Sequence, residues 1–328
     1  AHYAGGVGVA SSNLAGPTIF SSMNSKPKIG WIGLGVMGSS MVQNLLHAGY
    51  DVRVFTRTKS KATTVLEKGA QWCDNLNAVA EGVAIVCTMV GYPEDVENIV
   101  LGKHGLLHEM QSGSLLIDFT TSSPELAHLI AERASAREIE VLDAPVSGGD
   151  VGAKAGTLAI MCGGALKAFQ KAEPILSNMG DKIQHFGDAG SGQRVKMSNQ
   201  ILIASTMVGM VESMLYAERA GLKVNQVIDL IGQGAAGCWS IHQLGPRIIQ
   251  EDWAPGFYIK HFLKDMRIAL EDASRMGLRL EGLELANRFY ANAKTWEWEN
   301  DGTQGLMKIL RKLNASLEIK EGFQNLSS

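Results

Sequence analysis

Three glycines near the start of the chain have the spacing G-x-G-x-x-G, which matters chemically because glycine lets a backbone come close to a ligand. The residues of this loop are Gly33, Leu34, Gly35, Val36, Met37 and Gly38. The loop follows an apolar run at 29–32 that predicts a buried strand, and it opens a helical pattern at 37–48. In that context the first glycine permits a tight turn, the second lets the backbone approach a pyrophosphate, and the third lets helix and strand pack closely. We expect all six residues to contact a dinucleotide; a strand–turn–helix without a ligand is the alternative.

The end of the second predicted strand indicates which dinucleotide fits. NAD sites usually place an acidic residue there for the ribose 2′-hydroxyl, but this chain has none between Asp51 and Glu67. It has Arg57, which can stack on adenine and pair with a 2′-phosphate, and Thr58 and Lys61 are further donors. We therefore predict NADP(H) as the preferred cofactor and NAD(H) as the second choice. A solvated basic turn is the alternative.

A serine followed by two glycines, Ser147, Gly148 and Gly149, comes soon after a predicted strand at 140–144. Ligands gather at the carboxyl ends of strands in doubly wound sheets. Two successive glycines also expose backbone N–H groups that can surround an anion. The segment is therefore a candidate anion site, and a flexible turn is the alternative.

Lys196 is the candidate acid or base. It begins a long, largely apolar helical pattern at 195–220 that ends at Gly221. A lysine at the N-terminus of a buried helix meets the positive end of the dipole and loses solvent, and both effects lower its pKa. Such a lysine can exchange protons near neutral pH. Asn199 and Gln200 share its helix face. A surface lysine whose stem packs on the helix is the alternative.

The elements that position these residues alternate along the first half of the chain. Apolar runs predict strands at 29–32, 52–55, 83–90, 115–119, 140–144 and 158–162, and helical patterns separate most of them. This order predicts an α/β fold with a Rossmann-type, doubly wound parallel sheet. The later patterns are helical almost throughout, at 195–220, 225–233, 240–250, 262–276, 280–295 and 303–315.

We therefore expect three parts. Residues 1–25 are rich in Gly, Ala and Ser without acidic residues, and they predict a disordered leader rather than a transit or signal peptide. Residues 26–192 form the predicted NADP-binding domain. Residues 193–328 form an all-helical C-terminal domain, which the helix at 195–220 joins to the first.

Composition excludes several classes of partner. Charged residues are 19% of the chain and the net charge is −3, so nothing favours nucleic acid or a membrane surface. The longest apolar region, 201–216, is interrupted by polar residues, and we expect no membrane span. The four cysteines form no C-x-x-C pair, so we predict no metal site and no disulfide framework.

Four motifs in order resemble the β-hydroxyacid dehydrogenases. They are Ile32 to Gly38, Asp143 to Gly149, Gly190 to Lys196, and Lys264 with Asp265. Their order and spacing cover nearly all of 28–315. The chain is similar to 3-hydroxyisobutyrate dehydrogenases, and its Thr-Arg-Thr turn is most similar to that of the glyoxylate/succinic semialdehyde reductases, which use NADPH.

The resemblance assigns roles that the residues alone leave open. It implies that Lys196 is the general acid/base and that the Ser147 segment holds a substrate carboxylate. It implies an asparagine partner three or four residues after the lysine, and we expect Asn199, with Gln200 as the other candidate. Further cofactor contacts implied by the family are Met89, Val90, Thr120 and Lys264.

The implied activity is NADP(H)-dependent interconversion of a small β- or γ-hydroxy acid and its semialdehyde. A homodimer or homotetramer is expected, chiefly from the family. The scattered cysteines fit a reducing compartment, so we expect the cytoplasm, with mitochondria and plastids as alternatives. An imine reductase of the same architecture and a non-catalytic dinucleotide-binding protein are the competing interpretations, and Lys196 argues against both. His185 and His261 are the next candidates for the base.

Overall fold

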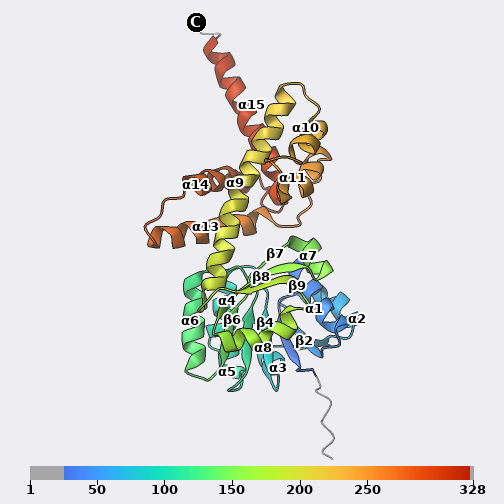
Figure 1. The fold of residues 1–328 in the computed structure, drawn as a ribbon, viewed down its shortest axis with the longest axis vertical. Helices are drawn as coiled ribbons and strands as arrows, with labels where there is room; N and C mark the ends of the chain where they lie inside the picture. Colours follow the sequence, from blue (N-terminus) through green and yellow to red (C-terminus); the bar gives the residue numbers. More distant parts are fainter. Residues whose placement is uncertain (1–25, 326–328) are drawn as a thin grey trace, which may run out of the picture.

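The computed structural model describes residues 26–325, with side chains described to residue 315. The leader expected at 1–25 lies outside the described residues. Figure 1 shows two regions: a sheet flanked by helices, and a group of helices beyond it. Helix α9 (Ser191–Arg219) runs from one region into the other. The predicted fold class, a Rossmann-type sheet followed by a helical region, is confirmed.

Nine strands form the sheet of the described residues, in the order β3-β2-β1-β4-β5-β6-β8-β7 with β9 beside β8. The strands are β1 (Ile29–Ile32), β2 (Val52–Phe55), β3 (Gln71–Trp72), β4 (Ile85–Thr88), β5 (Leu115–Asp118), β6 (Glu140–Asp143), β7 (Val146–Ser147), β8 (Leu158–Gly164) and β9 (Gly180–His185). The first six are parallel, whereas β8 runs antiparallel to β6 and β7. Strands β1, β4 and β5 are buried along their whole length, which explains their continuous apolar sequences.

Helices cover both faces of this sheet. Helices α1 (Val36–His47) and α8 (Leu166–Leu176) pack into one apolar core, and α4 (Pro93–Leu101) and α6 (Pro124–Ser135) pack into another on the opposite face. The shorter elements of this region are η1 (Lys59–Ala62), α2 (Thr63–Glu67), α3 (Leu76–Ala80), α5 (Leu106–Glu109) and α7 (Gly149–Ala155). The order of the strands reverses at β1 and β4, so the edge formed by their carboxyl ends is where such a fold binds ligands.

The long helix begins earlier than the sequence suggested. Helix α9 starts at Ser191, whereas the pattern predicted 195, because glycines at its start resemble a loop. Gly192 is required there: a Cβ atom would lie 2.4 Å from the Met161 carbonyl oxygen. By length and composition α9 could cross a membrane, the one described helix that could. However, it packs against β8 and against α13, α14 and α15, as a core helix does.

The rest of the chain is helical, as predicted. Its elements are α10 (Val224–Ile231), α11 (Trp239–Gln243), α12 (Gly245–Ile249), α13 (Ile259–Arg275), α14 (Glu281–Thr295), η2 (Thr303–Gly305) and α15 (Leu306–Asn325). The single helix predicted at 240–250 is two helices, because Pro246 cannot donate the backbone hydrogen bond that a continuous helix needs. Helix α13 begins at Ile259, three residues before the prediction.

Candidate active site

A cavity of about 620 Å³ opens where the carboxyl ends of β1, β2 and β4 face the helical region. Its walls include every residue of the glycine-rich loop, together with Gly256, Phe257 and Tyr258 from the helical side. The cavity therefore lies between the two regions. The volume and the edge of the sheet both suit a dinucleotide.

The three glycines of the loop have the geometry that the motif requires. Gly33 has a φ of 97°, and a Cβ atom there would lie 2.1 Å from the Met89 carbonyl oxygen. A Cβ at Gly38 would lie 2.1 Å from the Gly33 carbonyl oxygen, so only glycine permits this helix start. A Cβ at Gly35 would meet nothing within 4 Å, because Gly35 faces the cavity. The backbone at Gly35 is therefore open to a phosphate group.

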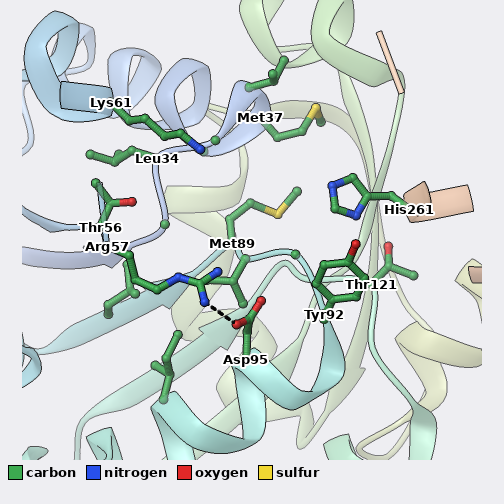
Figure 2. Close-up of a pocket in the computed structure, with 18 of the residues that line it drawn as sticks. Leu34, Met37, Thr56, Arg57, Lys61, Met89, Tyr92, Asp95, Thr121 and His261 are labelled. Atoms are coloured by element: carbon green, nitrogen blue, oxygen red, sulfur yellow. Dashed lines mark ion pairs between the residues drawn. The ribbon is translucent and has the colours of Figure 1, made fainter. Parts of the chain in front are cut away.

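Basic and polar side chains follow the end of β2 along the same wall. Arg57, Thr58 and Lys61 all line the cavity, as predicted from the absence of an acid after the strand. An acid nevertheless comes from another element: Asp95 in the first turn of α4 lies 3.1 Å from the Arg57 guanidinium (Figure 2). The two side chains are distant in sequence, so only the fold reveals this pair.

The other predicted cofactor contacts divide into two groups. Met89, Val90 and Lys264 line the cavity, whereas the neighbour Thr121 lines it in place of Thr120. Thr120 is buried, and its hydroxyl oxygen accepts a hydrogen bond from the backbone N–H of Val90. Thr120 therefore connects two adjacent strand ends and shapes the cavity wall from behind.

His261, on α13, provides an unpaired polar atom in the cavity wall. Its Nδ1 is buried and has no hydrogen-bond partner in the described structure. Burial, and to a smaller extent Lys264 and Lys260, lower its pKa to about 4, so the ring is neutral at working pH. The His261 ring lines the cavity and packs against Tyr92, but this nitrogen is enclosed by protein. The glycine-rich loop and Arg57 are the groups that fit a nicotinamide dinucleotide.

The start of α9 is fixed to the sheet. The Asp143 carboxylate, at the end of β6, accepts hydrogen bonds from the backbone N–H groups of Gly190 at 2.7 Å and Gln193 at 2.9 Å. The Gln193 side chain in turn donates to the Thr120 carbonyl oxygen at 2.8 Å and accepts from the Ser122 N–H. These buried contacts set the position of every residue in the first turns of the helix.

Lys196 lies in the second turn of α9 and is 7% exposed. Burial lowers its pKa from 10.5 to about 8; the smaller effects of Asp265, which raises the pKa, and Lys264, which lowers it, oppose each other. The dipole contribution expected from the sequence does not apply, because α9 begins five residues earlier and the dipole acts mainly within the first turn. Lys196 is not among the residues that line the dinucleotide cavity, but it lies close enough to Lys264 and Asp265, which do line it, to feel their charges.

A buried chain of polar contacts joins this lysine's helix to α13. Asn199 donates to the Gln200 side-chain oxygen at 2.8 Å, and Gln200 donates to the Asp265 carboxylate at 2.6 Å. Asp265 is paired with Lys264 at 2.8 Å, and Lys264 also donates to the Thr121 carbonyl oxygen. Both members of the Lys264–Asp265 pair are buried in the second turn of α13. The sequence alone suggested a solvated surface pair.

The predicted anion segment reaches the same network. The Ser147 hydroxyl lies 3.5 Å from the Asn199 side-chain oxygen. Gly148 and Gly149 have φ values of 128° and 64°, a backbone conformation that L side chains rarely adopt. Ser147 and Gly148 line a second cavity of about 390 Å³, whereas Gly149 begins α7. The fold thus brings together the predicted acid/base, its asparagine and the anion segment.

His185, one of the two histidines considered as a base, lies elsewhere. Its Nε2 is 2.7 Å from the Gly164 carbonyl oxygen, and its ring packs on Phe169 at the end of β9. The residues that sequence reasoning missed are Asp95 and Trp239, which belong to no recognisable motif, so only their position in the fold identifies them. Gln193 lies within the Gly190 to Lys196 motif, but sequence reasoning assigned it no role of its own.

The chain matches two described families and many known proteins. Residues 28–187 match the NAD binding domain of 6-phosphogluconate dehydrogenase, and residues 190–310 match the NAD-binding domain of NADP-dependent 3-hydroxyisobutyrate dehydrogenase. An uncharacterized oxidoreductase of Bacillus subtilis is 50% identical over 284 residues, which are 87% of this chain and 99% of that protein. A probable 3-hydroxyisobutyrate dehydrogenase-like protein of Arabidopsis thaliana, described as mitochondrial, is 47% identical over 305 residues, 92% of this chain and 91% of that protein.

A solved structure agrees with these sequence matches. The 3-hydroxyisobutyrate dehydrogenase of Mycobacterium tuberculosis with L-serine has a TM-score of 0.79 and 29% identity, covering 87% of this chain and 99% of that one. The resemblance drawn from the four motifs is therefore confirmed. The protein is an NAD(P)-dependent dehydrogenase that belongs to the β-hydroxyacid dehydrogenase family.

Proposed function

We propose that the protein catalyses NADP(H)-dependent interconversion of a small β- or γ-hydroxy acid and its semialdehyde. The observation that carries this proposal is the burial of Lys196 on α9 near Lys264 and Asp265, which line the dinucleotide cavity; burial lowers the pKa of the amine to about 8. A nicotinamide dinucleotide in that cavity supplies or accepts the hydride.

Lys196 moves the proton in this proposal. As an ammonium it donates a proton to the carbonyl oxygen during reduction, and as a neutral amine it accepts the hydroxyl proton during oxidation. A pKa of about 8 keeps both forms populated near neutral pH. The hydrogen-bonded chain from Asn199 through Gln200 to Asp265 holds the neighbouring polar groups in place.

The substrate class follows from the Ser147 segment. Gly148 and Gly149 have positive φ values, which glycine adopts without strain, and we propose that the backbone N–H groups of this turn bind the carboxylate. A substrate without that carboxylate would leave these donors unpaired, so discrimination against neutral aldehydes should be large. A small carboxylated alcohol or semialdehyde therefore fits the site better than a neutral one.

The choice of NADP(H) rests on Arg57, Thr58 and Lys61 in the cavity wall. Losing a charge-assisted contact to the 2′-phosphate costs about 1.5–3 kcal/mol, which is roughly 10- to 100-fold in affinity. Arg57 is 82% exposed and already paired with Asp95, so we expect the lower end of that range.

A panel of aldehydes with both cofactors tests the proposal. Glyoxylate, succinic semialdehyde, methylmalonate semialdehyde and tartronate semialdehyde should be reduced with NADPH in preference to NADH. Propanal and butanal should be much poorer substrates. Turnover of the neutral aldehydes at comparable kcat/KM would refute the carboxylate site, and equal use of NADH would refute the cofactor preference. Turnover of imines instead would favour the imine reductase alternative, against which the presence of Lys196 argues.

We further propose that the protein self-associates as a homodimer or homotetramer. Helix α9 leaves Leu202 and Tyr216 exposed, at 69% and 76%, on a face that the described residues do not cover. Figure 1 shows α15 extending away from the helical region. An exposed apolar face on a central helix suits a second copy of the chain. For the compartment we propose the cytoplasm, with mitochondria as the alternative that cell fractionation would distinguish.

A further inference from the structure

The second cavity, of about 390 Å³, is not required by the chemistry described above. It lies beside the anion segment, and α11 of the helical region contributes Trp239 and Gln243 to its wall. Its lining consists of Ser147, Gly148, Val151, Gly152, Thr157, Ala159, Lys182, Trp239 and Gln243. The cavity thus includes Ser147 and Gly148 of the segment proposed for the substrate carboxylate, and it shares no lining residue with the dinucleotide cavity.

Three neighbouring strands place a lysine across from the anion segment. Ser147 on β7 pairs with Ala159 on β8, and Ala159 pairs with Lys182 on β9. The three residues are in one row across the sheet, so Ser147 and Lys182 are two strand spacings apart, about 10 Å between Cα atoms. All three line the cavity.

An irregularity in β9 is what brings the lysine into this row. Leu158 pairs with Gly180 and the next residue, Ala159, pairs with Lys182, so Asp181 has no partner on β8. Such a bulge redirects the side chains that follow it. Without it, regular pairing would place the acidic Asp181 opposite Ala159. The bulge therefore replaces a negative charge by a positive one at the wall of the cavity.

The chemistry of the lining is that of a site for an anion on a short apolar stem. Lys182 is the one charged side chain in the lining, and no described residue forms an ion pair with it. Gln243 adds an amide donor. Val151 and Trp239 are largely exposed although they are apolar, the tryptophan at 59%. Both would lose water contact if a ligand filled the cavity.

We propose that this cavity is a second anion subsite and that the substrate is a hydroxy acid or semialdehyde with two carboxylates. The Ser147 segment holds one carboxylate, Lys182 and Gln243 bind the other, and Trp239 covers the carbon chain between them. This inference rests on the proposed function, since it assumes that the Ser147 segment holds the first carboxylate.

Binding of unreactive acids tests the subsite without turnover. Glutarate carries two carboxylates, and butyrate is a comparable chain with one. We would measure both by calorimetry, and as competitive inhibitors, on the full chain saturated with its preferred dinucleotide. The variants are Lys182→Ala and Lys182→Glu. Lys103→Ala is the control, because Lys103 is exposed and lies outside both cavities.

We expect the parent to bind glutarate more tightly than butyrate. Because Lys182 is exposed, Lys182→Ala should lower the affinity for glutarate by about 3- to 10-fold, and Lys182→Glu should lower that affinity further. Butyrate binding should change little. The advantage of glutarate should shrink as salt is added, since exposed charges are screened. Lys103→Ala should match the parent.

Two results would overturn the subsite. One is a parent that does not prefer glutarate, and the other is a preference that survives in Lys182→Glu. The failure of the proposed reaction looks different. If Lys182 variants weaken glutarate binding but no carboxylated semialdehyde is reduced, the subsite stands and the reaction class is wrong. If monocarboxylic semialdehydes are turned over and the Lys182 variants bind glutarate as the parent does, the proposed reaction is supported and the proposed subsite is wrong.

Discussion

Arg57 and Asp95 form an ion pair across the wall of the dinucleotide cavity, with 3.1 Å between the guanidinium nitrogen and the carboxylate oxygen. The second carboxylate oxygen of Asp95 is buried without a hydrogen-bond partner. A 2′-phosphate that binds Arg57 must therefore share the guanidinium with a fixed carboxylate. This acid lies on α4, not at the end of β2 where a sequence motif would place it.

The first prediction is that Asp95→Asn strengthens the preference for NADPH. Removing the competing charge should raise the ratio of NADPH to NADH affinity by about 2- to 5-fold, since exposed charge pairs are worth up to about 1 kcal/mol. Arg57→Asp should have the opposite effect and favour NADH. Cofactor fluorescence titration measures both. An Asp95→Asn protein with unchanged affinities would mean that Asp95 does not compete for Arg57.

The second prediction concerns Lys196 and proton transfer. Lys196→Ala should bind NADPH about as well as the parent, because Lys196 does not line the dinucleotide cavity. Its kcat should fall by about 10²- to 10⁴-fold, the usual contribution of a positioned acid or base. Lys196→Arg should not restore alcohol oxidation, because arginine stays charged.

The pH profile of the parent follows from the same amine. Oxidation needs the neutral form, so its kcat/KM should rise with pH through about 8. Reduction needs the ammonium, so its rate should fall over the same interval. Near-parental turnover of Lys196→Ala would instead direct attention to His261, and loss of NADPH binding would make Lys196 a structural residue.

The third prediction is that Asp265 and Lys264, on α13, shift the pH profile of alcohol oxidation in opposite directions. The negative charge of Asp265 raises the pKa of Lys196 and the positive charge of Lys264 lowers it. Asp265→Asn should therefore move the midpoint of the oxidation profile below pH 8, and Lys264→Gln should move it above. Asp229→Asn, an exposed change on α10, is the control. Shifts in the same direction for both variants would contradict this electrostatic account; melting curves would check that each variant folds.

The fourth prediction concerns self-association through α9. Leu202→Glu places a charge on the exposed apolar face and should dissociate the oligomer, with a smaller mass by sedimentation equilibrium. Leu166→Glu, at an exposed leucine on α8 at 56%, should leave the mass unchanged. A monomeric parent, or a Leu202→Glu protein of unchanged mass, would exclude this interface.

The sheet was predictable where strands are buried on both faces. The run at 29–32 coincides with β1, and the run at 115–119 matches β5 to within one residue, because continuous apolar sequences mark buried parallel strands. Strand β9 was missed because its sequence, Gly180–His185, is polar and partly exposed. Strand β3 was missed because it has only two residues, Gln71 and Trp72.

Some residues of the candidate site were likewise predictable from the sequence, and others were not. Motifs identified Lys196 and the glycine-rich loop, because their chemistry depends on neighbours in sequence. The partners of Gln200 and Arg57 could not be found in this way, since Asp265 and Asp95 are supplied by other elements. Thr120 was expected to face the dinucleotide. Its hydroxyl instead bonds to Val90, a detail of side-chain direction that periodicity does not encode.

Because the start of α9 is fixed, the number of residues between that start and Lys196 determines the direction in which the amine points. Asp143 holds the backbone at Gly190 and Gln193, and Lys196 follows three residues later on the same rigid helix. One residue inserted between Gln193 and Lys196 would turn the lysine by about 100° around the helix axis and advance it by about 1.5 Å. The amine would then face another side of the helix while every side chain in the site remained chemically intact. An insertion in this one turn should therefore not be tolerated by the chemistry.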